Sequence, residues 1–184
     1  ILGSGGVVPS IILALKKMKA SKIILSNRTK KNADRLNNFF KELKIIEWGE
    51  IPEFDVIINA TSIGLNKDDE INLNYKDLGS NKLFYDVIYN PKETNFLKKA
   101  KAFGNTTENG KMMFIYQAHQ SFTIWHKVMP EIDDEVLNLI WMIKIGILGA
   151  IGSGKTFVSK QFGLPVFNAD KEVLKIYKKN KICF

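Results

Sequence analysis

The chain has 184 residues, of which 45% are hydrophobic and 25% charged, a composition typical of globular proteins. It holds no run of about 18 apolar residues, no basic-then-apolar leader and a single cysteine, Cys183. These features argue against a membrane span, a secretion signal and an internal disulfide, so we expect a cytoplasmic protein that contacts no membrane.

The net charge of +8 is concentrated toward the end of the chain. Residues 142–184 contain eight lysines against Asp170 and Glu172. A basic segment can bind nucleic acid, but this one lacks interleaved aromatic residues, and lysine-rich solvated helix faces are common. We therefore expect no nucleic-acid partner. The oligomeric state cannot be read from the sequence.

Residues 1–141 alternate between strand and helix patterns, which predicts an α/β fold with a Rossmann-like, doubly wound parallel sheet. In chain order, the predicted elements are a helix over 7–19, a strand over 22–27, a helix over 30–43, strands over 54–60 and 82–91, and helices over 94–104, 111–128 and 133–141. The helix over 111–128 carries one apolar stripe, formed by Ile115, Ala118, Phe122 and Trp125.

A glycine loop, Gly3-Ser4-Gly5-Gly6, stands between a short strand and the first helix. There, backbone amides and a helix N-terminus can hold a pyrophosphate, although an ordinary tight turn would look similar. Val8 occupies the usual position of a third glycine. Only Ile1 and Leu2 precede the loop, whereas a full strand needs about five residues, so we expect the central first strand to be truncated.

The second strand ends in Asn27-Arg28-Thr29 and carries no acidic residue there. An NAD-binding protein usually has a carboxylate at this point for the ribose hydroxyl, whereas arginine can pair with the 2′-phosphate of NADP. The pattern favours NADP over NAD, and a solvated basic turn is the alternative.

The glycine loop, "NRT", "NATSIGL" (59–65), "YDVIYNP" (85–91) and the spaced residues Gly110, Gln117, Phe122 and Trp125 follow one another in order. Together they resemble the C-terminal, NADP-binding half of shikimate dehydrogenase across residues 1–141. The resemblance implies cofactor contacts at Gly3, Gly5, Gly6, Asn27, Arg28, Thr29, Asn59, Ala60, Thr61, Ser62 and Gly110, and shikimate contacts at Tyr89 and Gln117.

Several positions qualify this resemblance. Asn32 and Met112 stand where relatives often have arginine and glycine. The catalytic lysine and aspartate of the family belong to an N-terminal substrate domain that precedes Ile1, so we expect no turnover by this chain alone, and the choice between shikimate and quinate stays open. His119 and His126 are interpreted as structural or surface residues. Gln117 is set apart from them, because a polar residue in an otherwise apolar helix needs a partner, and a purely structural role is the alternative.

A second nucleotide site is predicted after Met142. A strand over 143–148 leads into G-x-x-x-x-G-K-T, with Gly149, Gly152, Ser153, Gly154, Lys155 and Thr156 placed to bind ATP and Thr156 to ligate Mg²⁺. With Asn168-Ala169-Asp170, this segment is similar to the beginning of dephospho-CoA kinase. That resemblance implies dephospho-CoA as the acceptor and Asp170 as its base or orienting group.

The sequence thus predicts two units, residues 1–141 and a C-terminally truncated unit, 142–184, with no linker between them. We expect the end of one gene merged with the start of another, and a true bifunctional fusion is the alternative. The leading hypothesis is the cofactor-binding part of an NADP-dependent shikimate dehydrogenase. The alternatives are a phosphotransferase acting on dephospho-CoA, or an inactive merged fragment.

Overall fold

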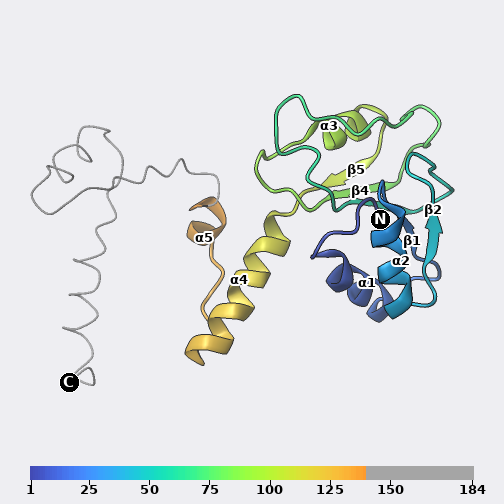
Figure 1. Ribbon diagram of the computed structural model, residues 1–184. Coiled ribbons are helices and arrows are strands. Elements are labelled where there is room, and N and C mark those ends of the chain that lie inside the picture. Colours follow the sequence, from blue (N-terminus) through green and yellow to red (C-terminus); the bar gives the residue numbers. More distant parts are fainter. Residues whose placement is uncertain (140–184) are drawn as a thin grey trace, which may run out of the picture. The chain divides into compact units, whose positions relative to one another are not determined.

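The computed structural model describes residues 1–139 of the chain. The chain divides into two units, Ile1–Trp141 and Met142–Phe184. The predicted ATP-binding residues, the Mg²⁺ ligand Thr156 and Asp170 lie outside the described residues. Residues 1–139 are coloured from blue to orange in Figure 1.

The described strands are all parallel, as the alternating pattern predicts. The strands β1 (Ile24–Ser26) and β2 (Lys44–Ile46) pair with each other, and β3 (Val56–Asn59), β4 (Leu83–Asp86) and β5 (Thr106–Glu108) form a second ladder. Leu2 makes parallel bridges to both Ser26 and Asn59, so it lies between the two ladders. The spatial order is therefore β2, β1, Leu2, β3, β4, β5, with the first residues of the chain at the centre.

The sequence pattern did not predict β2 and β5. Each is only three residues long, and both include exposed residues because they lie at the two ends of the order. The strand β1 is equally short, but it lies within the apolar run Ile23–Leu25, whereas β2 and β5 are set among more polar residues and give no clear pattern. The pairing of β2 and of β5 is decided by the neighbouring strand.

All five predicted helices are present: α1 (Val8–Lys17), α2 (Lys30–Phe39), α3 (Asn95–Ala102), α4 (Lys111–His126) and α5 (Asp134–Leu139). Pro9 lies in the first turn of α1, where its missing N–H leaves no bond unmade. Thr94 caps α3 by accepting a hydrogen bond from the Leu97 amide. The helix α2 ends four residues before its predicted limit, because the chain turns at Phe40 and buries Leu43.

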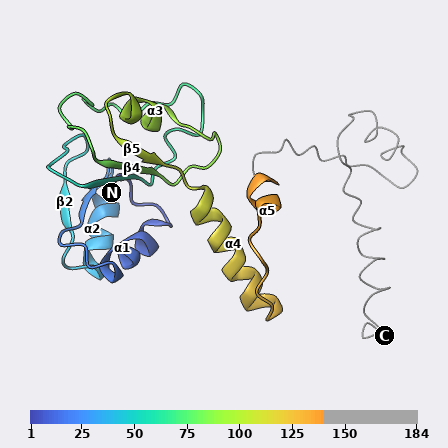
Figure 2. The same ribbon diagram turned by 180° about the vertical axis from the view of Figure 1, so that it is seen from behind.

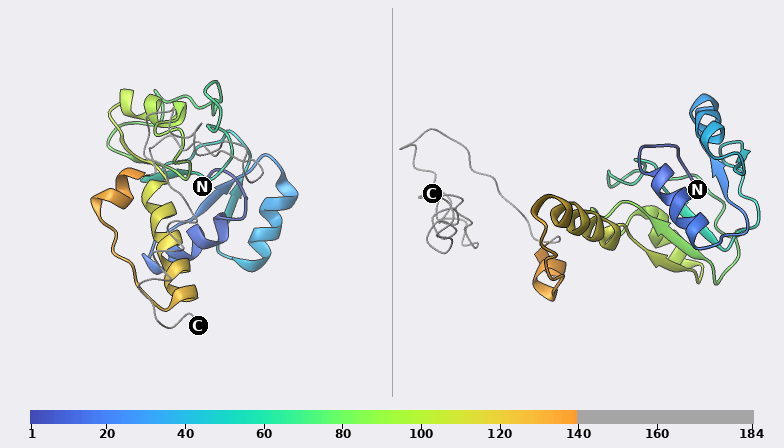
Figure 3. Two further views of the ribbon diagram at one scale, coloured as in Figure 1. Left: turned by 90° about the vertical axis from the view of Figure 1, so that its left-hand side faces the viewer. Right: turned by 90° about the horizontal axis from the view of Figure 1, so that it is seen from below.

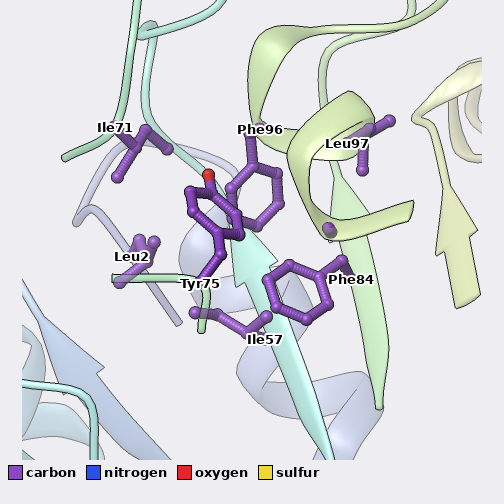
Figure 4. Close-up of a cluster of buried hydrophobic side chains, with 8 residues drawn as sticks. Leu2, Ile57, Ile71, Tyr75, Phe84, Phe96 and Leu97 are labelled. Atoms are coloured by element: carbon purple, nitrogen blue, oxygen red, sulfur yellow. The ribbon is translucent and has the colours of Figure 1, made fainter. Parts of the chain in front are cut away.

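Two apolar clusters cover the two faces of the sheet. The helices α1 and α2 lie on one side of the strands and α3 on the other (Figures 1 and 2). The α1–α2 side buries Val8, Ile12, Ile23, Leu25, Ala33, Leu43 and Ala60. The α3 side, drawn in Figure 4, buries Leu2, Ile57, Ile71, Tyr75, Phe84, Phe96, Leu97 and Ala100. Because side chains alternate along a strand, the sheet presents apolar residues to a cluster on each of its faces.

The long helix α4 differs from the other helices because most of its apolar stripe is exposed. Ile115 is buried, but Phe122 is 43% and Trp125 75% exposed, and Ala118 is exposed as well. Figure 3 shows α4 leading away from the strands. The helical period of the stripe was predicted correctly, yet within residues 1–139 only its first member is buried. None of the described helices is long and apolar enough to cross a membrane.

Candidate functional site

The glycine loop is held where Leu2 leaves the sheet. Gly3 has φ +99°, and a Cβ added there would lie 2.8 Å from the Ala60 carbonyl oxygen and 2.9 Å from Thr61 Cγ2. The Gly3 amide donates to the Ser26 carbonyl at 2.8 Å. Both the backbone conformation and the close approach require glycine at this position. The loop is therefore fixed between the ends of β1 and β3.

Gly5 and Gly6 face open space. A Cβ on Gly5 would meet only the Ala60 carbonyl oxygen, at 3.8 Å, and one on Gly6 would meet nothing within 4 Å. The helix α1 that follows has no acidic residue in its first turn and no side chain capping its N-terminus. Its partial positive charge is therefore not offset by a carboxylate of that turn. This is the arrangement in which a helix start accepts a phosphate.

A basic turn follows β1 at the same edge of the sheet. Ser26 is buried and donates its hydroxyl to the Glu47 carbonyl at 3.0 Å, which ties the strand end to β2. The Asn27 side-chain amide donates to the Thr29 carbonyl at 2.7 Å and shapes the turn. Arg28 and Lys30 are exposed, and neither forms an ion pair within the part of the chain that the structure describes. Both cations are thus available to a phosphate.

The loop after β3 is organised by Asn59, the last residue of that strand, which is fully buried. Its side-chain oxygen accepts from the Thr61 amide at 3.1 Å and from the Thr61 hydroxyl at 2.7 Å. Its side-chain nitrogen donates to the Ile63 carbonyl at 3.0 Å. Ala60 is buried and Ser62 exposed, so the loop presents Thr61 and Ser62 at its surface while Asn59 fixes its shape.

Asp86 and Thr94, which the sequence patterns did not single out as site residues, lie behind this loop. Asp86, at the end of β4, is fully buried and accepts from the Asn59 side chain at 3.1 Å and from the Thr94 hydroxyl at 2.7 Å. Burial raises the pKa of Asp86, against the opposing effect of these hydrogen bonds and of one from the Ile88 amide. The available signal was a lone acid inside the apolar run "LFYDVI".

The next strand end carries Tyr89 and meets the start of α4. A Cβ on Gly110 would lie only 1.9 Å from the Val87 carbonyl oxygen, and the Gly110 amide donates to the Ile88 carbonyl at 3.2 Å. Glycine is thus required by backbone packing. The half-buried Tyr89 ring stacks on Phe114 with centroids 4.5 Å apart.

Gln117 lies on the exposed side of α4, and no hydrogen bond joins it to another of the described residues. His119 bonds the Pro130 carbonyl at 2.9 Å, and the His126 ring lies 4.4 Å from that of Phe122. Within residues 1–139, no group of three or more His, Cys, Asp or Glu could hold a metal ion.

The predicted cofactor residues of the first unit therefore gather at the carboxyl ends of Leu2, β1, β3 and β4, the edge where parallel sheets bind ligands. A hollow of about 320 Å³ lies beside this edge, between Gly64–Lys67 and the start of α3. A larger cavity of about 490 Å³ lies at the opposite end of the strands, bordered by Lys22 and Asp55, and includes neither the loop glycines nor Arg28. The candidate site is therefore placed at the edge that carries the loop glycines and Arg28 rather than in the larger cavity, because polar and charged groups determine which ligand can bind.

No family model matches the chain. Its sequence is 62% identical over 140 residues to the shikimate dehydrogenase (NADP(+)) of Pelagibacter ubique (strain HTCC1062), covering 76% of this chain and 53% of that protein. The crystal structure of shikimate dehydrogenase from Aquifex aeolicus matches with a TM-score of 0.64 and 37% identity, over 71% of this chain and 48% of that one. A shikimate dehydrogenase in complex with NADP⁺ matches with a TM-score of 0.52 and 37% identity, over 64% and 45% of the two chains.

About three quarters of the chain is thus homologous to shikimate dehydrogenases, and the fold is their Rossmann-like parallel sheet. The chain spans about half the length of the curated relatives it matches.

Proposed function

We propose that residues 1–141 form the NADP-binding part of a shikimate dehydrogenase, which transfers hydride between the cofactor and the 3-dehydroshikimate/shikimate pair. The observation that carries this proposal is the junction of Gly3 with Ala60 and Thr61, beside an Arg28 that forms no ion pair among the described residues. It combines a phosphate-binding loop with a cation suited to a 2′-phosphate. The homologues named NADP(+)-dependent support the same choice.

Each part of the site takes a separate role in this proposal. The amides of Gly5 and Gly6 and the start of α1 hold the pyrophosphate. Arg28, flanked by Asn27 and Thr29, holds the 2′-phosphate. The Ala60–Ser62 loop lines the cofactor toward its reactive end. The bound cofactor supplies the hydride, and the protein supplies orientation and charge.

The substrate side is proposed to begin at Tyr89 and Gln117, with the Gly110 backbone meeting the nicotinamide amide. The stacking of Tyr89 on Phe114 limits the ring's rotation and so its hydroxyl's position. We assign no proton-transfer group within residues 1–139. Turnover is therefore proposed for the enzyme to which this part belongs, with shikimate as its substrate.

The cofactor proposal is tested by titrating the full chain with NADPH and with NADH and following nucleotide fluorescence. We expect tighter binding of NADPH, and we expect Arg28→Ala to remove most of the difference, because a charge-assisted bond to a phosphate contributes about 1.5–3 kcal/mol. The matched control is Arg35→Ala, which removes an exposed arginine further along α2 and should leave the preference unchanged.

Equal affinity for NADPH and NADH in the parent chain would contradict the role of Arg28. A loss of preference in Arg35→Ala as large as that in Arg28→Ala would show a general effect of positive charge rather than a specific pairing.

For residues 142–184 we propose, from the residue pattern alone, an ATP- and Mg²⁺-binding start of a dephospho-CoA kinase. Lys155 would contact the β- and γ-phosphates, and Asp170 would lie near the acceptor hydroxyl. Lys155→Ala is expected to abolish ATP binding by the full chain, measured calorimetrically. An unchanged ATP titration in this variant, or none in the parent chain, would contradict the proposal.

A further inference from the structure

The carboxylate of Asp86 lies behind the candidate site and touches neither open surface nor, among the described residues, a basic side chain. Its Oδ1 accepts from Asn59 Nδ2 at 3.1 Å and from the Ile88 amide at 3.0 Å, and its Oδ2 accepts from the Thr94 hydroxyl at 2.7 Å. Three donors, from β3, from the turn after β4 and from the cap of α3, therefore take the place of a counter-ion. Such a group imposes order because each of its bonds is buried.

The carboxylate fixes which way the Asn59 amide points. An ionised carboxylate only accepts hydrogen bonds, so Asn59 must turn its nitrogen toward Asp86 and its oxygen toward the loop. That oxygen accepts from both the amide and the hydroxyl of Thr61. The Thr61 hydroxyl in turn accepts from the Ile63 amide at 3.0 Å. The conformation of residues 59–63 therefore depends on Asp86 through a single side chain.

A second connection runs to the other half of the site. The Ile88 amide donates to Asp86, and the Ile88 carbonyl accepts from the Gly110 amide. Ile88 directly precedes Tyr89. One buried carboxylate thus holds both the cofactor loop and the turn that carries Tyr89 and contacts the start of α4.

We propose that Asp86 is the positioning residue of the nucleotide site, acting through Asn59 on the loop Ala60–Ser62 and through Ile88 on Gly110. The proposal rests on the proposed binding of NADP at this edge of the sheet. Asp86 makes no contact with the cofactor itself; it sets the geometry of the groups that do. A buried carboxylate is costly to desolvate, and apolar residues at such places often stabilise a fold better. Asp86 contributes instead by fixing the conformation of the loop Ala60–Ser62 and of the turn that carries Ile88.

The test uses three variants of the full chain. Asp86→Ala removes all three acceptor bonds. Asp86→Asn keeps one acceptor oxygen. The Ile88 amide and the Asn59 side chain donate to the same oxygen, Oδ1, so the amide oxygen of the new side chain is expected to take that place. Thr94→Val is the matched control: it removes the bond from the α3 cap to the same carboxylate but leaves the bond to Asn59. Dissociation constants for NADPH and NADH and thermal stability are measured for each.

We expect Asp86→Ala to weaken binding of NADPH and NADH by the same factor, about tenfold. This is the effect of one buried hydrogen bond, because of the three bonds lost it is the one from Asn59 that positions the loop Ala60–Ser62. The ratio of the two dissociation constants stays at the parent value, because the preference for NADPH is assigned to Arg28, which Asp86 does not contact. In Asp86→Asn we expect both affinities to stay within about threefold of the parent values, a smaller loss than the tenfold loss of the alanine variant. Thr94→Val lowers the melting temperature and leaves both affinities unchanged. A purely structural role would instead make affinity follow stability in all three variants.

Hydrogen exchange in the absence of cofactor provides a second readout. The Thr61 amide, which bonds the Asn59 side chain, is expected to exchange faster in Asp86→Ala than in the parent, while amides within α1 keep their rates. If Asp86→Ala does not fold, Asp86→Ser replaces it. Its hydroxyl can still accept from the Ile88 amide two residues on but is too short to reach Asn59.

A folded Asp86→Ala or Asp86→Ser chain with parent affinities, or with an unchanged Thr61 exchange rate, would overturn the proposal. So would Asp86→Asn binding as weakly as the alanine variant, or Thr94→Val losing as much affinity. Absence of any NADPH or NADH binding by the parent chain would instead contradict the proposed function, and the proposal for Asp86 would fall with it.

Discussion

At the scale of single residues, buried polar groups in the described part of the chain differ in how well they are satisfied. Both carboxylate oxygens of Asp86 and both the oxygen and the nitrogen of the Asn59 side chain have hydrogen-bond partners. Thr94 both donates to Asp86 and accepts from the Leu97 amide. The Tyr75 hydroxyl is buried and has no partner among the described residues. Burial, with the nearby charges of Glu70 and Asp86, raises its pKa, so this hydroxyl stays neutral.

Tyr75→Phe tests whether this hydroxyl contributes to folding. The ring stacks between Phe84 and Phe103, and phenylalanine keeps those contacts. Because an unsatisfied buried hydroxyl costs about 1–3 kcal/mol, we expect the free energy of unfolding to rise by about 1 kcal/mol. Urea denaturation measures the change, with Tyr116→Phe as the control, since Tyr116 is 55% exposed. A clear loss of stability in Tyr75→Phe would reveal a partner for the hydroxyl.

At the scale of elements, glycines decide where helices can start beside the strands. Gly3 lets the chain leave the sheet against Ala60, and Gly110 lets α4 begin against Val87. In both places the nearest atom is a backbone carbonyl oxygen of another segment, which cannot move aside as a flexible side chain could. Gly6 is the contrasting case, because nothing lies within 4 Å of its Cβ position.

We therefore expect Gly110→Ala to destabilise the fold and Gly6→Ala to leave stability nearly unchanged. A Cβ placed 1.9 Å from the Val87 carbonyl oxygen forces α4 or the turn after β4 to shift, at a cost of about 2 kcal/mol or more. For Gly6→Ala, a change within about 0.5 kcal/mol is expected. Thermal and urea unfolding of both variants provide the comparison. Equal stability of the two would contradict the tight packing at Gly110.

At the scale of the whole molecule, the described unit has a two-sided core and one helix largely outside it. The sheet buries apolar side chains on both faces, whereas α4 and the segment after it expose Phe122, Ile124, Trp125, Val128 and Met129. Exposed apolar residues gathered on one element usually mark a surface that contacts something else. The chain also spans about half the length of its curated relatives.

The sequence predicted the motifs of the site better than their surroundings. The glycine loop, the turn at Arg28 and the residues from Asn59 to Ser62 each carry a local pattern with a chemical reason. Their arrangement at one edge followed from the parallel sheet. The importance of Asp86 could not be predicted in this way, because its three partners come from Asn59, Ile88 and Thr94, and only folding brings Asn59 close.

The sequence by itself determined the class of fold, the helices and the three strands β1, β3 and β4, while the preference for NADP stays a prediction. These depend on periodicity and on residue types that act locally. Only the tertiary structure decided the strands β2 and β5 and the exposure of the α4 stripe and of Gln117. Pairing and burial depend on which segments meet, and that is set by contacts between residues far apart along the chain.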